Sequence, residues 1–124
     1  MRVLVVEDSQ VIRTIIIKEL RDIGTVDIEQ AEEGLAAMRK ISSNFFDLIT
    51  LDITMPGADG ITVLNHIKAV SPDSRVVICS AHNHKDIVME AIRIGINDYI
   101  IKPFAVECLH EVLKRQIELL SQNG

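Results

Sequence analysis

Residues 47–57 read DLITLDITMPG and contain the feature that decides the fold. The apolar run ends at Asp52, and a Pro-Gly pair follows shortly after, a pattern typical of a buried strand that gives way to a loop. Three other apolar runs end in the same way, at Glu7 and Asp8, at Ser80, and at Lys102 beside Pro103. Four predicted strands therefore each end at a side chain that can bind phosphate or a metal ion.

Short apolar runs rich in β-branched residues alternate along the chain with helical patterns. The predicted strands lie at about 2–6, 26–30, 47–51, 75–79 and 97–101, and the predicted helices at about 10–23, 33–42, 60–70, 85–94 and 106–121. Gly24 and Gly95 follow two of these helices directly, where a left-handed residue often ends a helix. Five βα units of this kind predict a parallel sheet that is covered by helices on both faces.

The order of the strands follows from how apolar each one is. Residues 3–6 and 47–51 are nearly unbroken apolar runs, as expected of central strands, whereas residues 26–30 alternate like a half-exposed edge strand. Among the common doubly wound arrangements, the order 2-1-3-4-5 fits best. We therefore expect an α/β fold, a flavodoxin-like (βα)5 three-layer sandwich. One domain is predicted over residues 1–121, with residues 122–124 as a frayed tail or a truncated linker.

The composition limits the classes of partner. The 124 residues carry a formal net charge of -5, which argues against direct binding of nucleic acid, because such surfaces need clustered basic residues. No apolar run approaches the roughly 18 residues of a membrane span, and no signal peptide is recognisable, so we expect a cytoplasmic protein without membrane insertion. Cys79 and Cys108 lie in a strand and a helix pattern and are predicted to be free thiols.

The carboxylates predict a metal site. In a sheet of this order, ligands gather at the carboxyl ends of the strands, beside the point between strands 1 and 3 where the order reverses. Glu7, Asp8 and Asp52 should converge there. Three carboxylates repel one another unless a cation lies between them, and oxygen ligands favour Mg²⁺, with Mn²⁺ as the alternative.

A hydroxyl and an ammonium group should reach the same edge of the sheet. Ser80 and Lys102 end the fourth and fifth predicted strands, and we expect them on the other side of Asp52 from the metal. There they could hold two oxygens of a phosphoryl group. Attack by a carboxylate on phosphorus builds negative charge that a metal ion and a lysine can offset. The predicted chemistry is the formation of an aspartyl phosphate on Asp52.

These residues give the chain an end-to-end resemblance to the receiver domains of two-component response regulators, single-domain chemotaxis regulators among them. The resemblance makes Asp52 the phosphoacceptor, assigns Mg²⁺ to Glu7 and Asp8 with the backbone carbonyl of Thr54, and makes Lys102 the phosphate-binding lysine. It also implies that Ser80 is the switch hydroxyl, that Tyr99 changes rotamer with it, and that the bond from Lys102 to Pro103 is cis. A glutamate in the acidic pair and a serine at the switch depart from the commonest pattern.

The resemblance implies a function in signal transduction by phosphorelay. A sensor histidine kinase or a phosphotransfer protein would supply the phosphoryl group, and the domain would catalyse only its own phosphorylation and dephosphorylation. A downstream protein would bind the surface formed by the fourth helix, fifth strand and fifth helix, and a phosphorylation-dependent homodimer stays open. Thr54 and His82 occupy positions that tune the lifetime of the phosphorylated state. A stand-alone protein and a receiver cut from a longer regulator would look the same.

Three alternatives stay open. A receiver could act as a scaffold independently of phosphorylation. A hydrolase of the haloacid dehalogenase type would also use an aspartate nucleophile, but it carries a second Asp where this chain has Thr54. A nucleotide- or flavin-binding module is disfavoured because neither G-x-G-x-x-G nor G-x-x-x-x-G-K-[ST] occurs. His82 and His84 are predicted to be solvated loop residues and not metal ligands.

Overall fold

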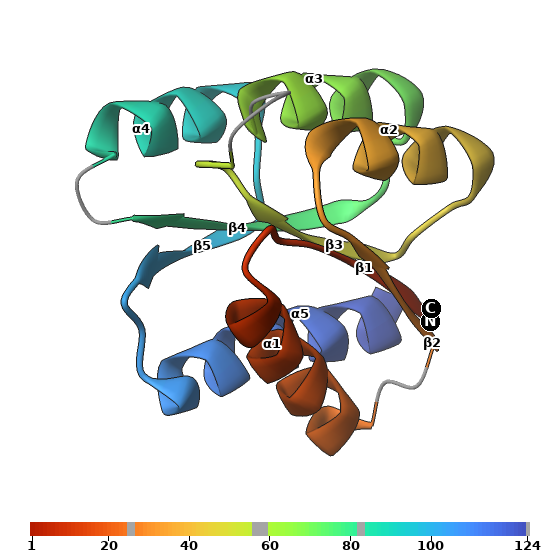
Figure 1. The fold of residues 1–124 in the computed structure, drawn as a ribbon. Helices are drawn as coiled ribbons and strands as arrows, with labels where there is room; N and C mark the ends of the chain where they lie inside the picture. The colour runs from red at the N-terminus through yellow and green to blue at the C-terminus, as the bar shows by residue number, and fades with distance from the viewer. Residues whose placement is uncertain (25–26, 56–59, 82–83, 124) are drawn as a thin grey trace.

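A computed structural model describes residues 1–24, 27–55, 60–81 and 84–123. Strands and helices alternate along these residues, as the sequence predicts (Figure 1). The elements are β1 (Arg2–Val6), α1 (Gln10–Ile23), β2 (Asp27–Ala31), α2 (Gly34–Ser43), β3 (Leu48–Asp52), α3 (Gly60–Val70), β4 (Arg75–Ala81), α4 (Lys85–Ile94), β5 (Asp98–Lys102) and α5 (Val106–Asn123).

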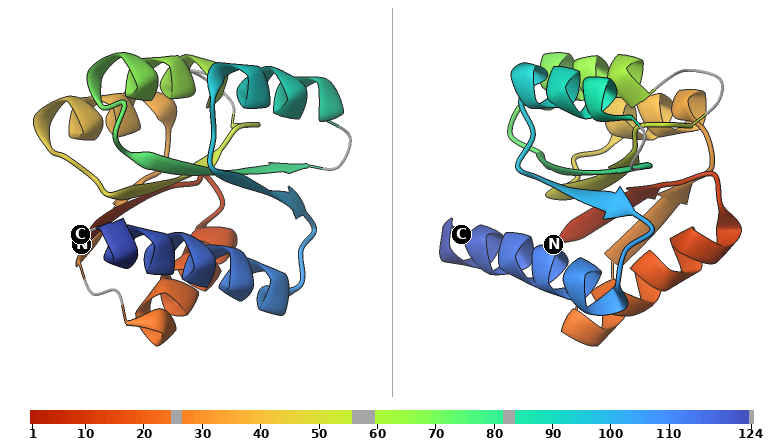
Figure 2. Two further views of the ribbon diagram at one scale, coloured as in Figure 1. Left: turned by 180° about the vertical axis from the view of Figure 1, so that it is seen from behind. Right: turned by 90° about the vertical axis from the view of Figure 1, so that its left-hand side faces the viewer.

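The strands form one parallel sheet in the order β2-β1-β3-β4-β5, which confirms the prediction. Helices α2, α3 and α4 cover one face of the sheet, and α1 and α5 cover the other (Figures 1 and 2). Successive residues of a strand point to opposite faces, so Val3 and Val5 pack with α1 and α5 while Leu4 and Val6 pack with α2, α3 and α4. The site at the strand ends thus rests on two separate apolar cores.

Some element boundaries differ from the predicted ones. Strand β4 runs on through Ser80 to Ala81, because these two residues pair with Ile101 and Lys102 of β5. Ser80 therefore lies inside the strand and does not end it. Helix α5 continues two residues beyond its predicted end, to Asn123, and the division of the chain at residue 121 stays a prediction.

Local features fix where the helices begin and end. The hydroxyl of Ser9 accepts a hydrogen bond from the Ile12 amide and so caps α1. Gly24 follows α1 in the left-handed conformation with a φ angle of 117°, as predicted. Gly95 follows α4 with a positive φ angle of 119°, but its ψ angle of 108° lies outside the left-handed helical region. At Gly60 a Cβ atom would lie 2.2 Å from the Cα of Ile53, so only glycine lets α3 begin this close to the segment that follows Asp52.

Within the described residues, no helix is long and apolar enough to cross a membrane. Cys79 and Cys108 are both free thiols, as expected. Cys79 is buried in β4, and burial raises its pKa to about 12, whereas Cys108 lies exposed on α5.

Candidate functional site

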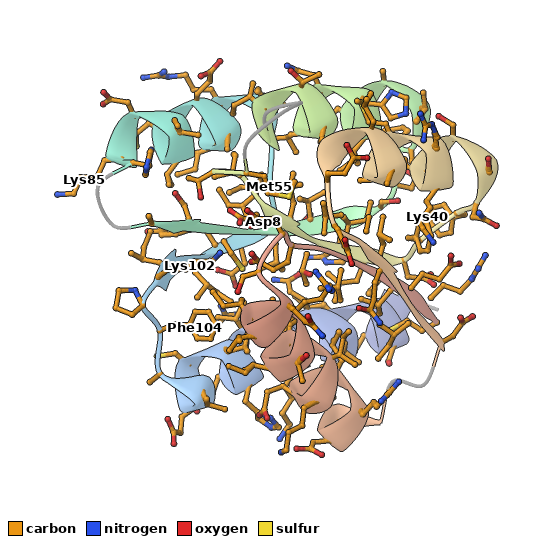
Figure 3. The ribbon with its side chains drawn as sticks, in the orientation of Figure 1. Asp8, Lys40, Met55, Lys85, Lys102 and Phe104 are labelled. Carbon is orange, nitrogen blue, oxygen red and sulfur yellow. The ribbon has the colours of Figure 1, made fainter. Side chains whose placement is uncertain are left out.

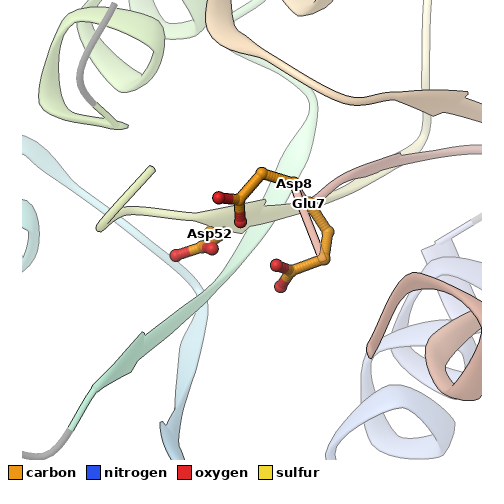
Figure 4. Close-up of side chains that lie close together, drawn as sticks. All are labelled: Glu7, Asp8 and Asp52. Atoms are coloured by element: carbon orange, nitrogen blue, oxygen red, sulfur yellow. The ribbon is translucent and has the colours of Figure 1, made fainter. Parts of the chain in front are cut away.

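Three carboxylates meet at the carboxyl ends of β1 and β3. Glu7 and Asp8 follow β1 directly, and Asp52 is the last residue of the neighbouring strand β3. One oxygen from each carboxylate lies within 4.8 Å of the others (Figure 4). Glu7 and Asp52 are only 1% and 3% exposed, whereas Asp8 is open to solvent. The predicted convergence is confirmed, and the cluster can be reached from outside through Asp8.

Lys102 reaches the cluster from the end of β5. Its Nζ donates to Oε1 of Glu7 at 2.8 Å and to Oδ2 of Asp52 at 3.2 Å. In Figure 3 Asp8 and Lys102 both lie at the level of the sheet, between the two layers of helices. The expectation that the lysine lies apart from the acidic pair is wrong, because the glutamate side chain, one methylene longer than aspartate, brings its carboxylate to the buried ammonium.

Thr54 holds the other oxygen of Asp52. Its backbone amide and its hydroxyl both donate to Oδ1, at 2.9 and 2.8 Å. The two oxygens of Asp52 therefore have different partners, with Thr54 on Oδ1 and Lys102 on Oδ2. The resemblance made the carbonyl of Thr54 a metal ligand and placed Thr54 at a position that tunes the lifetime of the phosphorylated state. Both roles stay predictions, and the two donated hydrogen bonds are a finding of the structure.

Burial and charge separate the protonation states of the two buried carboxyls. Burial raises the pKa of Glu7 to about 7, the Lys102 hydrogen bond opposes this, and the Asp52 charge adds to it. Burial acts to raise the pKa of Asp52 as well, but hydrogen bonds from Thr54 and the charge of Lys102 outweigh it and lower that pKa. Burial acts to lower the pKa of Lys102, yet its two carboxylate partners raise it, so the ammonium stays charged. Asp52 is therefore an anion at neutral pH.

The donor set fits a hard divalent cation. All three side chains offer carboxylate oxygens, which Mg²⁺ and Mn²⁺ prefer, and the exposure of Asp8 leaves room for water ligands. Three carboxylates share the single ammonium of Lys102, which contacts Glu7 and Asp52, so the cluster has excess negative charge. A divalent cation would supply the missing positive charge.

Ser80 and Tyr99 lie beside this cluster but do not join it. The buried hydroxyl of Ser80 donates to the carbonyl of Ala81 at 3.3 Å, not to Asp52. Tyr99 is 47% exposed on β5 and lines a mostly apolar groove of about 330 Å³ between α4 and β5, together with Met89 and Ile92. The bond from Lys102 to Pro103 is cis, as expected.

Some sequence predictions lie outside the described residues. These are the Pro-Gly pair at 56–57 and His82 with its role in the lifetime of the phosphorylated state. His84, the other member of the histidine pair, directly precedes α4.

Sequence reasoning missed Arg13, which is 7% exposed and donates through Nη1 to the backbone carbonyl of Glu7 at 2.8 Å. A signal for it exists in the sequence. Arg13 stands three, four and seven residues before Ile16, Ile17 and Leu20, on the face of α1 that packs against the sheet. A charged residue on a buried helix face needs a partner inside the protein.

Comparisons with known proteins identify the family of the chain. The model of the response regulator receiver domain family matches residues 3–114. The chain is 36% identical over 116 residues to the chemotaxis protein CheY of Bacillus subtilis, an alignment that covers 94% of this chain and 97% of that protein.

Solved structures are similar over the same extent. The REC domain of AraT, a response regulator from Geobacillus stearothermophilus, has a TM-score of 0.89 at 26% identity and covers 98% of this chain and 96% of its own. The receiver domain of NtrX from Brucella abortus has a TM-score of 0.85 at 34% identity, with 94% of this chain and 98% of that chain covered.

Proposed function

The chain belongs to the response regulator receiver domain family, and we propose that it accepts a phosphoryl group on Asp52 with Mg²⁺ bound by Glu7, Asp8 and Asp52. One observation carries the proposal. A buried, ionised carboxylate is held by Thr54 on one oxygen and by Lys102 on the other, within 4.8 Å of two further carboxylates. The backbone carbonyl of Thr54 completes the proposed ligand set.

The transfer step uses the groups of the cluster in separate roles. A carboxylate oxygen of Asp52 attacks the phosphorus of a phosphohistidine; the O–P bond forms as the P–N bond breaks, and its electron pair returns to the imidazole. Lys102 offsets the charge on the equatorial oxygens, and Thr54 fixes the orientation of the nucleophile. Mg²⁺ held by Glu7, Asp8 and Asp52 would supply further positive charge to the site. The domain catalyses only its own phosphorylation and dephosphorylation.

Phosphorylation would then act on Ser80 and Tyr99. The Ser80 hydroxyl donates its hydrogen bond to the neighbouring Ala81 carbonyl, and Tyr99 lies partly exposed over the groove between α4 and β5. A phosphoryl group on Asp52 offers Ser80 a stronger acceptor, and movement of Ser80 lets Tyr99 turn inward. The surface of α4, β5 and α5 would change and alter the binding of a downstream protein.

The proposed partners follow from this chemistry. A sensor histidine kinase or a phosphotransfer protein donates the phosphoryl group, and a protein target reads the surface of α4, β5 and α5. Phosphorylation-dependent pairing of two copies through that surface and a location in the cytoplasm stay predictions. Action as a scaffold without phosphorylation is the rival outcome.

Intact-protein mass after incubation with acetyl phosphate and Mg²⁺ tests the proposal. We expect the wild type to gain one phosphoryl group and Asp52→Asn to gain none. Asp47→Asn is a matched control, because Asp47 directly precedes the same strand at its opposite end and binds the Arg2 amide. It should be phosphorylated like the wild type, and EDTA should abolish the gain in both proteins.

Three results would contradict it. Equal phosphorylation of Asp52→Asn would assign the phosphoryl group to another residue. A gain of mass in the presence of EDTA would show that phosphorylation requires no metal ion. No gain from either acetyl phosphate or histidine kinases would favour the scaffold.

Tyr99 is the only tyrosine in a chain without tryptophan, so its fluorescence reports the switch in the same samples. Fluorescence that stays constant on phosphorylation would contradict the movement of Tyr99.

A further inference from the structure

Arg13 connects three segments around the acidic pair. From α1, its Nη1 donates to the backbone carbonyl of Glu7 at 2.8 Å, its Nε to Oε1 of Gln30 at 2.8 Å and its Nη2 to Oε1 of Glu32 at 3.3 Å. The guanidinium is planar and its donors are fixed in direction, so three simultaneous acceptors define its position. The side chain is almost fully buried, which keeps water from replacing these bonds.

These contacts fix the peptide unit that carries the acidic pair. The Glu7 amide donates to the Ala31 carbonyl at 3.1 Å, and the Glu7 carbonyl accepts from Arg13. Both backbone polar groups of Glu7 are thereby held. The carbonyl of Glu7 belongs to the peptide that leads into Asp8, so its direction determines where the Asp8 side chain begins.

Asp8 depends on this backbone more than its neighbours do. Glu7 is held through its side chain, by Lys102 on Oε1 and by the Ser9 amide on Oε2. Asp52 is held by Thr54 and Lys102. Within the described part of the chain, no hydrogen bond or ion pair reaches the exposed Asp8 carboxylate. Among the described residues, the backbone alone places it within 4.8 Å of the other two carboxylates.

We propose that Arg13 is a positioning residue for the metal site: by fixing the Glu7 carbonyl it aims Asp8 at the cation. The inference rests on the proposed Mg²⁺ site. Groups that orient metal ligands are commonly worth about 10-fold to 100-fold in metal affinity. Replacement of Arg13 should therefore raise the Kd for Mg²⁺ by about tenfold or more.

The sign of the change separates positioning from charge. Arg13 is a cation near a cation site, so its charge alone repels Mg²⁺, and removal of that charge should tighten binding. Loss of the hold on Glu7 should weaken binding. A general loss of stability leaves the Kd unchanged as long as the protein stays folded.

Calorimetric titration with MgCl2 alone tests the proposal, with the folded fraction checked by circular dichroism. We expect Arg13→Met to bind Mg²⁺ at least about tenfold more weakly than the wild type. Arg75→Met is the matched control, because Arg75 begins β4 and donates to Gln116 at 2.7 Å, far from the strand carboxyl ends. Glu32→Gln, which leaves the Glu7 contact in place, should also bind like the wild type.

Arg13→Lys gives a second test that does not depend on the folding of Arg13→Met. The lysine keeps the positive charge but replaces the planar guanidinium group with one ammonium group, so we expect the Kd for Mg²⁺ to rise as well. Wild-type or tighter affinity in both Arg13 variants, or in Arg13→Lys alone if Arg13→Met does not fold, would overturn the positioning role. Absence of Mg²⁺ binding in the wild type would instead overturn the metal site itself.

Discussion

The two ends of the sheet both hold clusters of charged side chains, but with different charge balance and in different surroundings. At the carboxyl end, Lys102 lies between Glu7 and Asp52. At the amino end, Arg2 lies between Asp27 and Glu29. Glu29 also pairs with Lys40, so two cations face two carboxylates at the amino end, whereas Asp8 adds a third carboxylate beside Glu7 and Asp52 at the carboxyl end. The side chain of Lys102 is 16% exposed and its partners are buried, whereas Arg2 and its partners are substantially open to water.

The two ends differ both in charge balance and in access to water. Arg2 and Lys40 offset Asp27 and Glu29, and water screens these pairs, so this group contributes only modestly to stability. Burial prevents screening at the other end, and it raises the pKa of Glu7 to about 7. The carboxyl end therefore holds a deficit of positive charge, which a metal ion can fill. Balanced, exposed charges form surface ion pairs at one end, and unbalanced, buried charges form a candidate cation site at the other.

Removal of the central cation should break this comparison with the largest effect. Without Mg²⁺ at pH 8, we expect Lys102→Met to lower the free energy of unfolding by about 3–5 kcal/mol, because it leaves two buried carboxylates without their cation. Arg2→Met should cost about 1 kcal/mol or less, since its pairs are exposed. Urea denaturation in EDTA measures both. Equal losses in the two variants would show that burial does not set the energy of these pairs.

The pH dependence of stability should follow Glu7. Folding raises the pKa of Glu7 from 4.5 to about 7, so the native state holds this proton more tightly than the unfolded chain. Its contribution to stability is full below pH 4.5 and is lost as the pH rises through 7. We expect a loss of about 2–3 kcal/mol over that range without metal.

The control separates Glu7 from the many other groups that titrate there. Glu7→Gln should remove this part of the pH dependence, whereas Glu29→Gln, at the other end of the sheet, should retain it. Denaturation in EDTA at a series of pH values is the measurement. A Glu7→Gln protein with the pH profile of the wild type would contradict the raised pKa.

The sequence predicts the fold and the convergence of the site, because both follow from topology. Parallel strands bring their carboxyl ends to one edge, so apolar runs that end at Glu7, Asp52 and Lys102 suffice to gather these residues. The resemblance adds roles to the same positions. These predictions required only the identity of the strand that each residue ends.

The partners of each side chain could not be predicted in this way. The contact of Lys102 with Glu7 depends on side-chain length across strands that are not neighbours in the sheet. The bond from Arg13 to the Glu7 carbonyl depends on how α1 packs, and a backbone acceptor leaves no trace in the sequence. Periodicity gives the face of an element but not the atom that a side chain reaches.

The smallest expected effect lies between the two ends, at Thr50 of β3. Its hydroxyl is buried between Val5 and Val77 on the neighbouring strands, and it has no hydrogen-bond partner among the described residues. Thr50→Val removes this unpaired group with little change of shape, so we expect a gain of about 1 kcal/mol in the free energy of unfolding. Thr14→Val, whose hydroxyl bonds the Gln10 carbonyl on the exposed face of α1, should give no gain.

The Thr50→Val variant also tests where the functional cluster begins along β3. Thr50 points to the same face of β3 as Asp52, because residues two apart in a strand share a face. A more stable Thr50→Val protein with unchanged affinity for Mg²⁺ would mean that the functional cluster begins at Asp52 and that the hydroxyl below it carries only a cost. A lower stability together with weaker Mg²⁺ binding would place Thr50 in the site, with its hydroxyl bound to water beneath the carboxylates.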